Sequence, residues 1–307
     1  MTGEPAVSRS HAAAGFSLPE LLVSVMVLVA VMGTVTSLLL QMANAHRTVW
    51  NRTQMHSAVR GATELLQQEV GQAGLVALPG AITLTGAVTA GTQTVGVSAT
   101  AGLFVGEEIL VDAGANQEAV ALTAVDAGGL QITGVFTGNH AAGAVLTAAG
   151  GFASGIVPPS MVNGSTGSVL KLYGDVNGDN NMVYVEYTCD TAGHKLYRNV
   201  MAWDAVAKPA LSTAIVLLSN IVANPQGTPC FTYQTAVVGP NTYVTDVAIT
   251  LTVQTQDIDP VTRLFQTETK TLLNVSPRNV FNTWELASLG ISSRIQPMPA
   301  SVQALLQ

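Results

Sequence analysis

Charge is what this chain has least of. Only 10% of its 307 residues are charged, with 12 Lys and Arg against 19 Asp and Glu, so the net charge is −7. This balance supplies no basic surface for phosphate contacts, which argues against nucleic acid as a partner. The low charge suits a surface of Thr, Ser, Asn and Gln, or one that is buried against copies or other partners.

Motifs for catalysis are also missing. The sequence has no Gly/Lys phosphate loop, no Gly-x-Ser-x-Gly motif and no zinc-binding His-Glu motif. The adjacent acids Glu107 and Glu108 are of a kind common on strand edges. His140 has no second His or Cys at ligand spacing, which favours a turn residue over a metal ligand. We therefore expect a structural or binding protein and not an enzyme.

A long apolar run lies near the amino terminus. From Phe16 to about Met42 it exceeds the roughly 20 residues that cross a hydrocarbon core, yet it contains one acid, Glu20. Residues 43–76 continue with helical spacing, so we expect one helix of about 55–60 residues that ends at Gly71 and Gly74. The expected apolar stripe of its second half is Val49, Met55, Val59, Ala62, Leu66, Val70 and Ala73, and the expected polar face is Arg47, Arg52, Gln54, Arg60, Glu64 and Glu69.

The start of this run, "GFSLPELLVSVMVLVAV", resembles the class III signal of type IV prepilins and type II secretion pseudopilins. The resemblance implies that a prepilin peptidase removes residues 1–15 by cutting after Gly15 and methylates the new amino group of Phe16. It also implies that Glu20 pairs with the Phe16 ammonium of a neighbouring subunit in a filament. The alternative is a carboxylate at the membrane edge, since a charge deep in lipid costs about 3 kcal/mol.

The composition changes after the helix. Residues 77–150 are rich in Thr, Val, Ala and Gly, and short strands such as "EEILVDAG" and "LQITGVF" alternate with Gly and Asn turns. The pattern "GLFVGEEILVDAGANQEAVALTAV" followed by "FTGNHAAGAVL" is similar to small β-modules of bacterial surface and phage tail proteins. We expect an inserted all-β accessory module that serves display, spacing or adhesion.

Residues 151–307 return to a β-sheet head. "GSVLKLYGDVNGDNNMVYVEYTCDTAGHKLYRNV" predicts three strands, and "NTYVTDVAITLTVQTQDIDPVTRLFQTETKTLLNV" predicts a long hairpin. The order of these segments, the "LLQQEVGQAGL" helix end and a late "PRN" resemble PilW-like minor pilins, whose layout type II secretion pseudopilins share. The fold class implied is α+β: a long pilin stem helix, membrane-spanning in residues 16–42 and amphipathic in residues 43–76, packed on an antiparallel sheet.

One loop in the head imitates a calcium site. Its oxygen-bearing side chains alternate and end on a glutamate at the twelfth place, as in a calcium loop: Asp175, Asn177, Asp179, Asn181 and Glu186. Asn180 replaces the usual turn glycine, and Glu186 is expected in a strand. The alternative is a hairpin loop whose side chains make turn hydrogen bonds. Calcium is the one cofactor that the sequence suggests.

Cys189 and Cys230 are the two cysteines of the chain, and both lie in or beside predicted strands of the head. A pilin head matures outside the cytoplasm, where disulfides form. A metal pair or a nucleophile would need companions that the sequence lacks. We expect the two to form a disulfide.

The resemblance implies a single-pass protein of the inner membrane with its head in the periplasm. It would be processed and assembled into, or at the tip of, a type IV pilus for initiation, adhesion, motility or DNA uptake. Its partners would be other pilin subunits through the stem, the prepilin peptidase and the pilus assembly platform. Two alternatives stay open: a type II secretion pseudopilin, or a membrane-anchored module whose β-insert binds a surface ligand.

Overall fold

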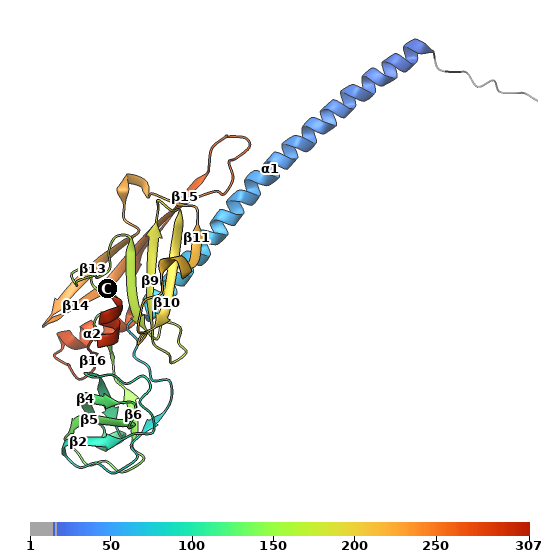
Figure 1. Cartoon of the computed structure of the whole chain (residues 1–307). Coiled ribbons are helices and arrows are strands. Elements are labelled where there is room, and N and C mark those ends of the chain that lie inside the picture. The colour runs from blue at the N-terminus through green and yellow to red at the C-terminus, as the bar shows by residue number, and fades with distance from the viewer. Residues whose placement is uncertain (1–14, 16) are drawn as a thin grey trace, which may run out of the picture.

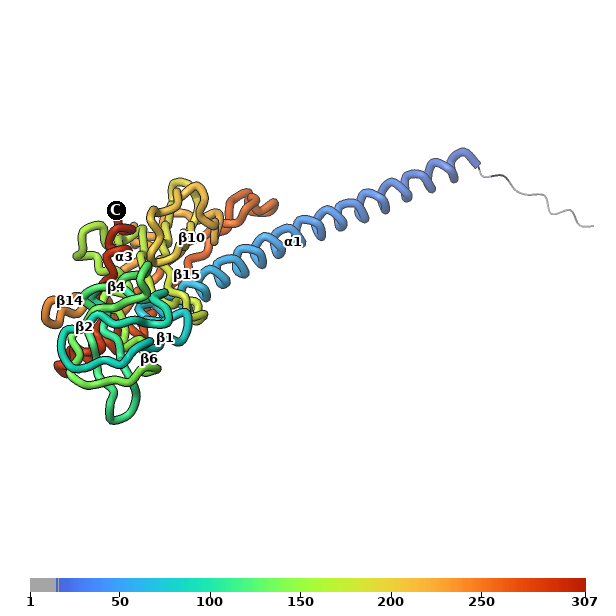
Figure 2. The backbone as a smooth tube through the Cα atoms, turned by 60° about the horizontal axis from the view of Figure 1, so that its bottom comes forward, coloured from blue at the N-terminus to red at the C-terminus, as the bar shows by residue number. Residues whose placement is uncertain are grey.

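The structure is a computed structural model that describes residue 15 and residues 17–307, so Phe16 and residues 1–14 of the expected leader lie outside the described residues. The chain folds as one long apolar helix followed by an antiparallel, sheet-rich head, an α+β arrangement (Figure 1). A small barrel lies at the end of the head remote from the start of the helix, as both views show (Figures 1 and 2).

Helix α1, Leu18–Gln72, is 55 residues long. Pro19 stands in its first turn, where its missing N–H is not needed. Gly74 follows the helix with a φ of +83°, the left-handed conformation that commonly ends helices. Its N–H donates to the Tyr173 carbonyl oxygen at 2.8 Å, which turns the chain onto the head. Gly71, the other expected terminator, remains inside the helix.

The two halves of α1 differ in burial. Residues 18–50 are exposed, apart from the half-buried Asn44 and Thr48, whereas a buried stripe begins at Asn51. Two residues lie on the opposite face from the one we expected. Val49 is exposed, although Thr48 beside it is half-buried, and Glu69 is buried because the head supplies it with an arginine partner.

The head contains two four-stranded sheets. The first has the order β11-β10-β9-β8, and the second is built around β14, with β12 and β13 along one edge and β15 along the other. Their strands are β8 (Val169–Gly174), β9 (Val183–Asp190), β10 (Lys195–Ala202), β11 (Ile215–Ser219), β12 (Ile221–Val222), β13 (Phe231–Val238), β14 (Asn241–Gln254) and β15 (Thr267–Val275). The buried stripe of α1 joins both sheets in one core, in which Leu66 clusters with Leu172 and Val247.

The barrel consists of β1 (Ile82–Thr83), β2 (Gly91–Gly96), β3 (Glu108–Val111), β4 (Glu118–Asp126), β5 (Gln131–Phe136) and β6 (Val145–Ala148). These strands pair in the order β1-β6-β3-β4-β5-β2, all antiparallel. A bridge between Leu84 and Val97, just after β1 and β2, joins the two ends of the sheet. Closure of this kind leaves no free sheet edge. The barrel encloses a core of its own, which includes Ile109, Leu122 and Phe136.

The carboxyl-terminal segment connects the barrel to the head. It forms α2 (Arg278–Ser288), β16 (Ile295–Gln296) and α3 (Ala300–Leu305), and β16 pairs in parallel with β7 (Gly151–Phe152), directly after the barrel. A separate core cluster fills the joint, where Phe104 of the barrel packs with Phe152 and with Val302 of α3. The joint is therefore built from three distant parts of the chain.

Candidate functional sites

The first half of α1 is an exposed apolar surface. Within the described residues, α1 is the one helix that is long and apolar enough to cross a membrane, and the apolar side chains of this stretch are exposed. Large exposed apolar surfaces mark interfaces in proteins. This half therefore needs a partner that the isolated chain does not contain.

Glu20 lies at the start of this surface, in the first turn of α1, and is exposed. The amino-terminal end of a helix favours a negative charge because its backbone N–H groups are unpaired there. Gly15 is exposed as well, three residues before α1 begins. Phe16, the expected site of cleavage and methylation, lies outside the described residues, so pairing between Glu20 and the Phe16 amino group stays a prediction.

A buried ion pair attaches α1 to the head. The Arg198 guanidinium of β10 donates from Nη2 to Glu69 Oε1 at 2.5 Å and from Nε at 3.1 Å, and the Tyr187 hydroxyl of β9 donates to the other carboxylate oxygen. Glu69 is 2% exposed. Hydrogen bonds between a guanidinium and a carboxylate are stronger than those between neutral groups because both partners are charged.

The same contacts shift the pKa values of the partners. Burial alone would lower the pKa of Arg198, but its bonds to Glu69 outweigh burial and raise it. Burial and the Glu69 charge together raise the pKa of Tyr187, so its proton stays on the hydroxyl. The group is a fixed structural joint between stem and sheet.

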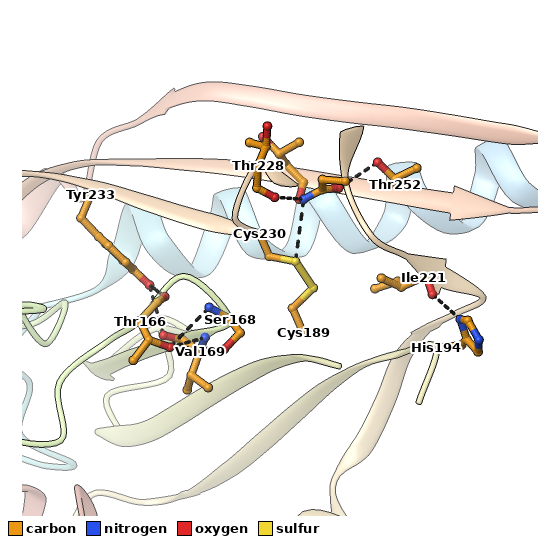
Figure 3. Close-up of a disulfide and its surroundings, with 12 residues drawn as sticks. Thr166, Ser168, Val169, Cys189, His194, Ile221, Thr228, Cys230, Tyr233 and Thr252 are labelled. Atoms are coloured by element: carbon orange, nitrogen blue, oxygen red, sulfur yellow. Dashed lines mark hydrogen bonds between the residues drawn. A yellow bond between two sulfur atoms is a disulfide. The ribbon is translucent and has the colours of Figure 1, made fainter. Parts of the chain in front are cut away.

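Cys189 and Cys230 form a disulfide, which links the end of β9 in the first sheet to the residue before β13 in the second (Figure 3). Asn224 holds the chain beside it: its side-chain N–H groups donate to the carbonyl oxygens of Thr228 at 3.0 Å and Thr250 at 2.8 Å. The two sheets are thus connected covalently at one end of their shared core.

The acidic loop is arranged as a turn. One Asp175 carboxylate oxygen accepts the N–H of Asp179 at 3.0 Å and the other accepts the N–H of Asn180 at 2.9 Å. Asp179 in turn accepts the N–H of Asn181. Asn180 has a φ of +64°, the left-handed conformation that the turn requires of it. Asn177, Asp179 and Asn181 are exposed, whereas Asp175 is buried.

Glu186 does not converge with this loop. It lies inside β9, three residues beyond the loop end of that strand, which corresponds to about 10 Å at 3.3 Å per residue. Its carboxylate oxygen lies 2.8 Å from Lys208 Nζ and 3.2 Å from Lys171 Nζ. Burial would raise the pKa of Glu186, but these ammonium groups and the Tyr184 hydroxyl lower it. The five predicted ligands are thus separated into a loop and an ion pair, and the loop side chains that are left lack the closing glutamate of a calcium loop.

In the barrel, a buried histidine bridges two carboxylates. His140 Nε2 lies 2.6 Å from Glu118 Oε1 and its Nδ1 lies 3.3 Å from Asp112 Oδ2. Burial would lower the pKa of His140, but the two carboxylates raise it, so the imidazolium form donates to both. Glu118 also accepts the N–H groups of Thr137 and Gly138. His140 therefore ties the loop after β5 to the barrel wall, and both its ring nitrogens are occupied by carboxylates.

The joint between barrel and head contains two buried polar side chains that the sequence did not reveal. Gln296 of β16 is fully buried, donates to the carbonyl oxygens of Glu108 and Ala149 at 2.6 Å each, and accepts the Glu108 N–H at 2.9 Å. Glu107 is also fully buried and accepts the Phe104 N–H at 3.2 Å. Burial raises the pKa of Glu107 to about 8, against the effect of that hydrogen bond. The sequence pattern suggested that Glu107 is an acid on a strand edge, but the structure places it inside the protein.

Across the described residues, no three His, Cys, Asp or Glu side chains are placed to hold a metal ion together. In comparisons with known proteins, the chain matches no family model, no curated protein and no solved structure.

Proposed function

We propose that this protein is a minor pilin-like subunit, anchored in a membrane by α1 and assembled into a filament through the same helix. The observation that carries the proposal is the division of α1. Its first half is apolar, exposed and begins with Glu20, while its second half is built into the core of the head. A helix of this design holds a head at a fixed distance from a membrane or from a bundle of identical helices.

The leader motif supports the same proposal. Cleavage after Gly15 would place a new amino group at Phe16, four residues before Glu20 and about one helical turn away. An amino group of this type is mostly protonated at neutral pH, since its reference pKa is near 8. In a bundle of such helices the ammonium of one subunit and Glu20 of another neutralise each other and set the axial register. Membrane insertion in the inner membrane, a periplasmic head and later residence in a pilus belong to this proposal.

The test uses two substitutions with different expected stages of failure. Gly15→Lys should block leader removal, and Glu20→Ala should allow removal but reduce incorporation into sheared filaments. Glu20→Asp serves as the matched control because it keeps the charge. Processing is followed by mass in the membrane fraction and incorporation by immunoblot of the filaments. Equal incorporation of Glu20→Ala and the wild type would contradict the charge-pairing account.

The barrel adds a second function, display of a binding surface. It is closed, has its own core and lies at the end of the molecule remote from the start of α1 (Figure 1). A subunit assembled through α1 would therefore present the barrel outward. Binding of the full-length protein to a glycan array, lost when residues 82–148 are replaced by a short linker, is the expected result for adhesion.

The main alternative is a type II secretion pseudopilin, which would use α1 in the same way. The two are separated by phenotype in the host cell. Deletion of a minor pilin should reduce surface filaments and leave secretion intact, whereas deletion of a pseudopilin should abolish secretion of exported enzymes.

A further inference from the structure

The loop between β14 and β15, residues 255–266, projects alongside α1 in the direction of its apolar half (Figure 1). Its base is attached to the helix, since Arg52 donates to the side chain of Gln266. Its turn is pre-formed: the buried Asp259 carboxylate accepts the N–H groups of Val261 at 2.7 Å and Thr262 at 3.0 Å. The loop therefore presents its side chains from a defined backbone.

Those side chains are apolar and unpartnered. Val261 is 70% exposed and Leu264 is 68% exposed, and Ile258 and Phe265 are exposed beside them. Trp50 on the adjacent turn of α1 is 70% exposed too. A groove between helix and loop, lined by His46, Arg47, Trp50 and Ile258, connects the two groups. Single exposed apolar residues are ordinary, but a contiguous set on a rigid turn marks an interaction surface.

The place of this surface along α1 indicates its partner. Between Glu20 and His46 the helix has no titratable side chain, a stretch of 25 residues or about 37 Å at 1.5 Å per residue. A bilayer is about 30 Å thick in its hydrocarbon core and about 40–45 Å with its headgroups. A membrane centred on this stretch has the outer edge of its headgroups near His46 and Arg47, where the groove begins.

The chemistry of the surface fits that depth. Trp is enriched at membrane–water interfaces because its ring is apolar and its N–H is polar. Arg47 and Arg263 are exposed beside the apolar set, and they would face lipid phosphates. Asp257 is the one exposed acid of the loop, because Asp259 is buried by its internal bonds. Apolar side chains ringed by basic groups are the composition of interfacial membrane anchors.

We propose that the β14–β15 loop and Trp50 form a second membrane contact, in which Val261, Leu264 and Phe265 enter the headgroup layer of a phospholipid bilayer. This inference rests on the proposed function only through the insertion of α1. A contact of this kind would fix the tilt and rotation of the head on the membrane, and release of the loop would accompany extraction of the subunit into a filament.

The test measures depth with nitroxide labels on the full-length, disulfide-intact protein in nanodiscs of phosphatidylcholine and phosphatidylglycerol. Labels are attached singly to Val261→Cys, Leu264→Cys, Val29→Cys and Val206→Cys. Val29 reports insertion of α1, and Val206 is a matched control because it is fully exposed and lies three residues after Trp203, which contacts Phe104 at the barrel joint. We expect the ratio of oxygen to nickel-chelate accessibility at 261 and 264 to be several-fold higher than at 206.

Three results would overturn the proposal, each in a different way. A lipid-like ratio at 29 with a water-like ratio at 261 and 264 would reject the loop contact and leave the insertion of α1 standing. A water-like ratio at 29 would reject the insertion itself. Shielding of 261 from both reagents, with spin–spin broadening that disappears when unlabelled protein is added, would show that a second copy of this chain covers the loop.

A variant without spin labels tests the same membrane contact. Val261→Asp with Leu264→Asp changes only exposed side chains, so the fold should be preserved. Hydrogen exchange of residues 258–265 should be slower in nanodiscs than in detergent for the wild type, and equal in the two media for the variant. Equal exchange in the wild type would contradict the membrane contact.

Discussion

The head and the barrel are both antiparallel β-structures, but they are stabilised by different means. The head has open sheets, and its core is complete only when the second half of α1 packs between them. It is reinforced by a buried ion pair and by a disulfide. The barrel closes its sheet on itself and shares no core residue with α1.

Under the proposed function, this difference would separate assembly, through α1 and the head, from display, by the barrel. The head and the second half of α1 share one core. The barrel is held at the far end by a small joint around Gln296 and Glu107. Changes to the barrel surface should thus leave α1 and the head unaffected.

The largest expected effect is in the joint between stem and head. Arg198→Met leaves Glu69 buried without its partner and should lower the free energy of unfolding of the head by about 3–5 kcal/mol. The double variant Glu69→Met with Arg198→Met should recover most of that loss, because an apolar pair replaces the ionic one. Hydrogen exchange by mass spectrometry should show the loss in β8–β15 and not in β1–β6. Equal loss of protection in the barrel would contradict the independence of the two parts.

Removal of the disulfide should also affect the head alone. Cys189 and Cys230 are 41 positions apart, and a loop of that length is worth about 4 kcal/mol in the chain-entropy model. Cys189→Ala with Cys230→Ala should therefore lower the unfolding transition of the head, measured by calorimetry of the full-length protein. Reduction of the wild type is the matched control and should give the same shift.

The barrel joint should depend on pH through Glu107. Its pKa is about 8 in the folded state, so between pH 4.5 and 8 the folded protein keeps a proton that the unfolded chain has lost. Stability should consequently fall as pH rises through this window, by up to about 1.4 kcal/mol per pH unit.

The matching variant is Glu107→Gln, which should remove most of this slope below pH 6.5, where His140 is protonated in both states. Above that pH, the raised pKa of His140 adds a slope of the same sign. Calorimetry of the barrel transition from pH 5 to 8 measures both. A slope that persists in Glu107→Gln below pH 6.5 would assign it to another group.

A smaller effect is expected at Gln296. Gln296→Ala leaves the Glu108 N–H and two carbonyl oxygens unpaired, at a cost of about 1–3 kcal/mol. Faster hydrogen exchange at residues 107–109 and 149–151, with unchanged exchange in the barrel core, is the expected signature. Gln303→Ala on the exposed side of α3 is the control and should change neither.

The smallest effect is expected from calcium. Asp175 is occupied by two backbone N–H groups and Glu186 by two lysines, so millimolar calcium should leave the melting temperature of the head unchanged. Asp179→Ala should behave like the wild type in this respect. A calcium-dependent rise that disappears in Asp179→Ala would show that the loop does bind the ion, since only binding to the folded state stabilises it.

Local patterns in the sequence were sufficient for much of the fold. The 55-residue length of α1 follows from a helical repeat that is interrupted only near Gly74, and burial of Met55, Val59 and Leu66 follows from their spacing. Strands β8–β10 and the hairpin of β14 and β15 were predicted because alternation and turn residues are local signals. The first half of α1 was also predicted, because an apolar run long enough to cross a bilayer is visible in the sequence alone.

The sequence by itself determined which segments form helix and strand, because those preferences depend on neighbours in the chain. Only the tertiary structure decided where the charged and polar groups go. Glu69 is buried because Arg198, 129 positions later, meets it, and Gln296 is buried because it pairs with Glu108, 188 positions earlier. The barrel closes where Leu84 pairs with Val97, and no local sequence pattern predicts this pairing. A charge or amide can be buried only where a partner from elsewhere in the chain compensates its lost hydration, and such partners exist only once the chain has folded.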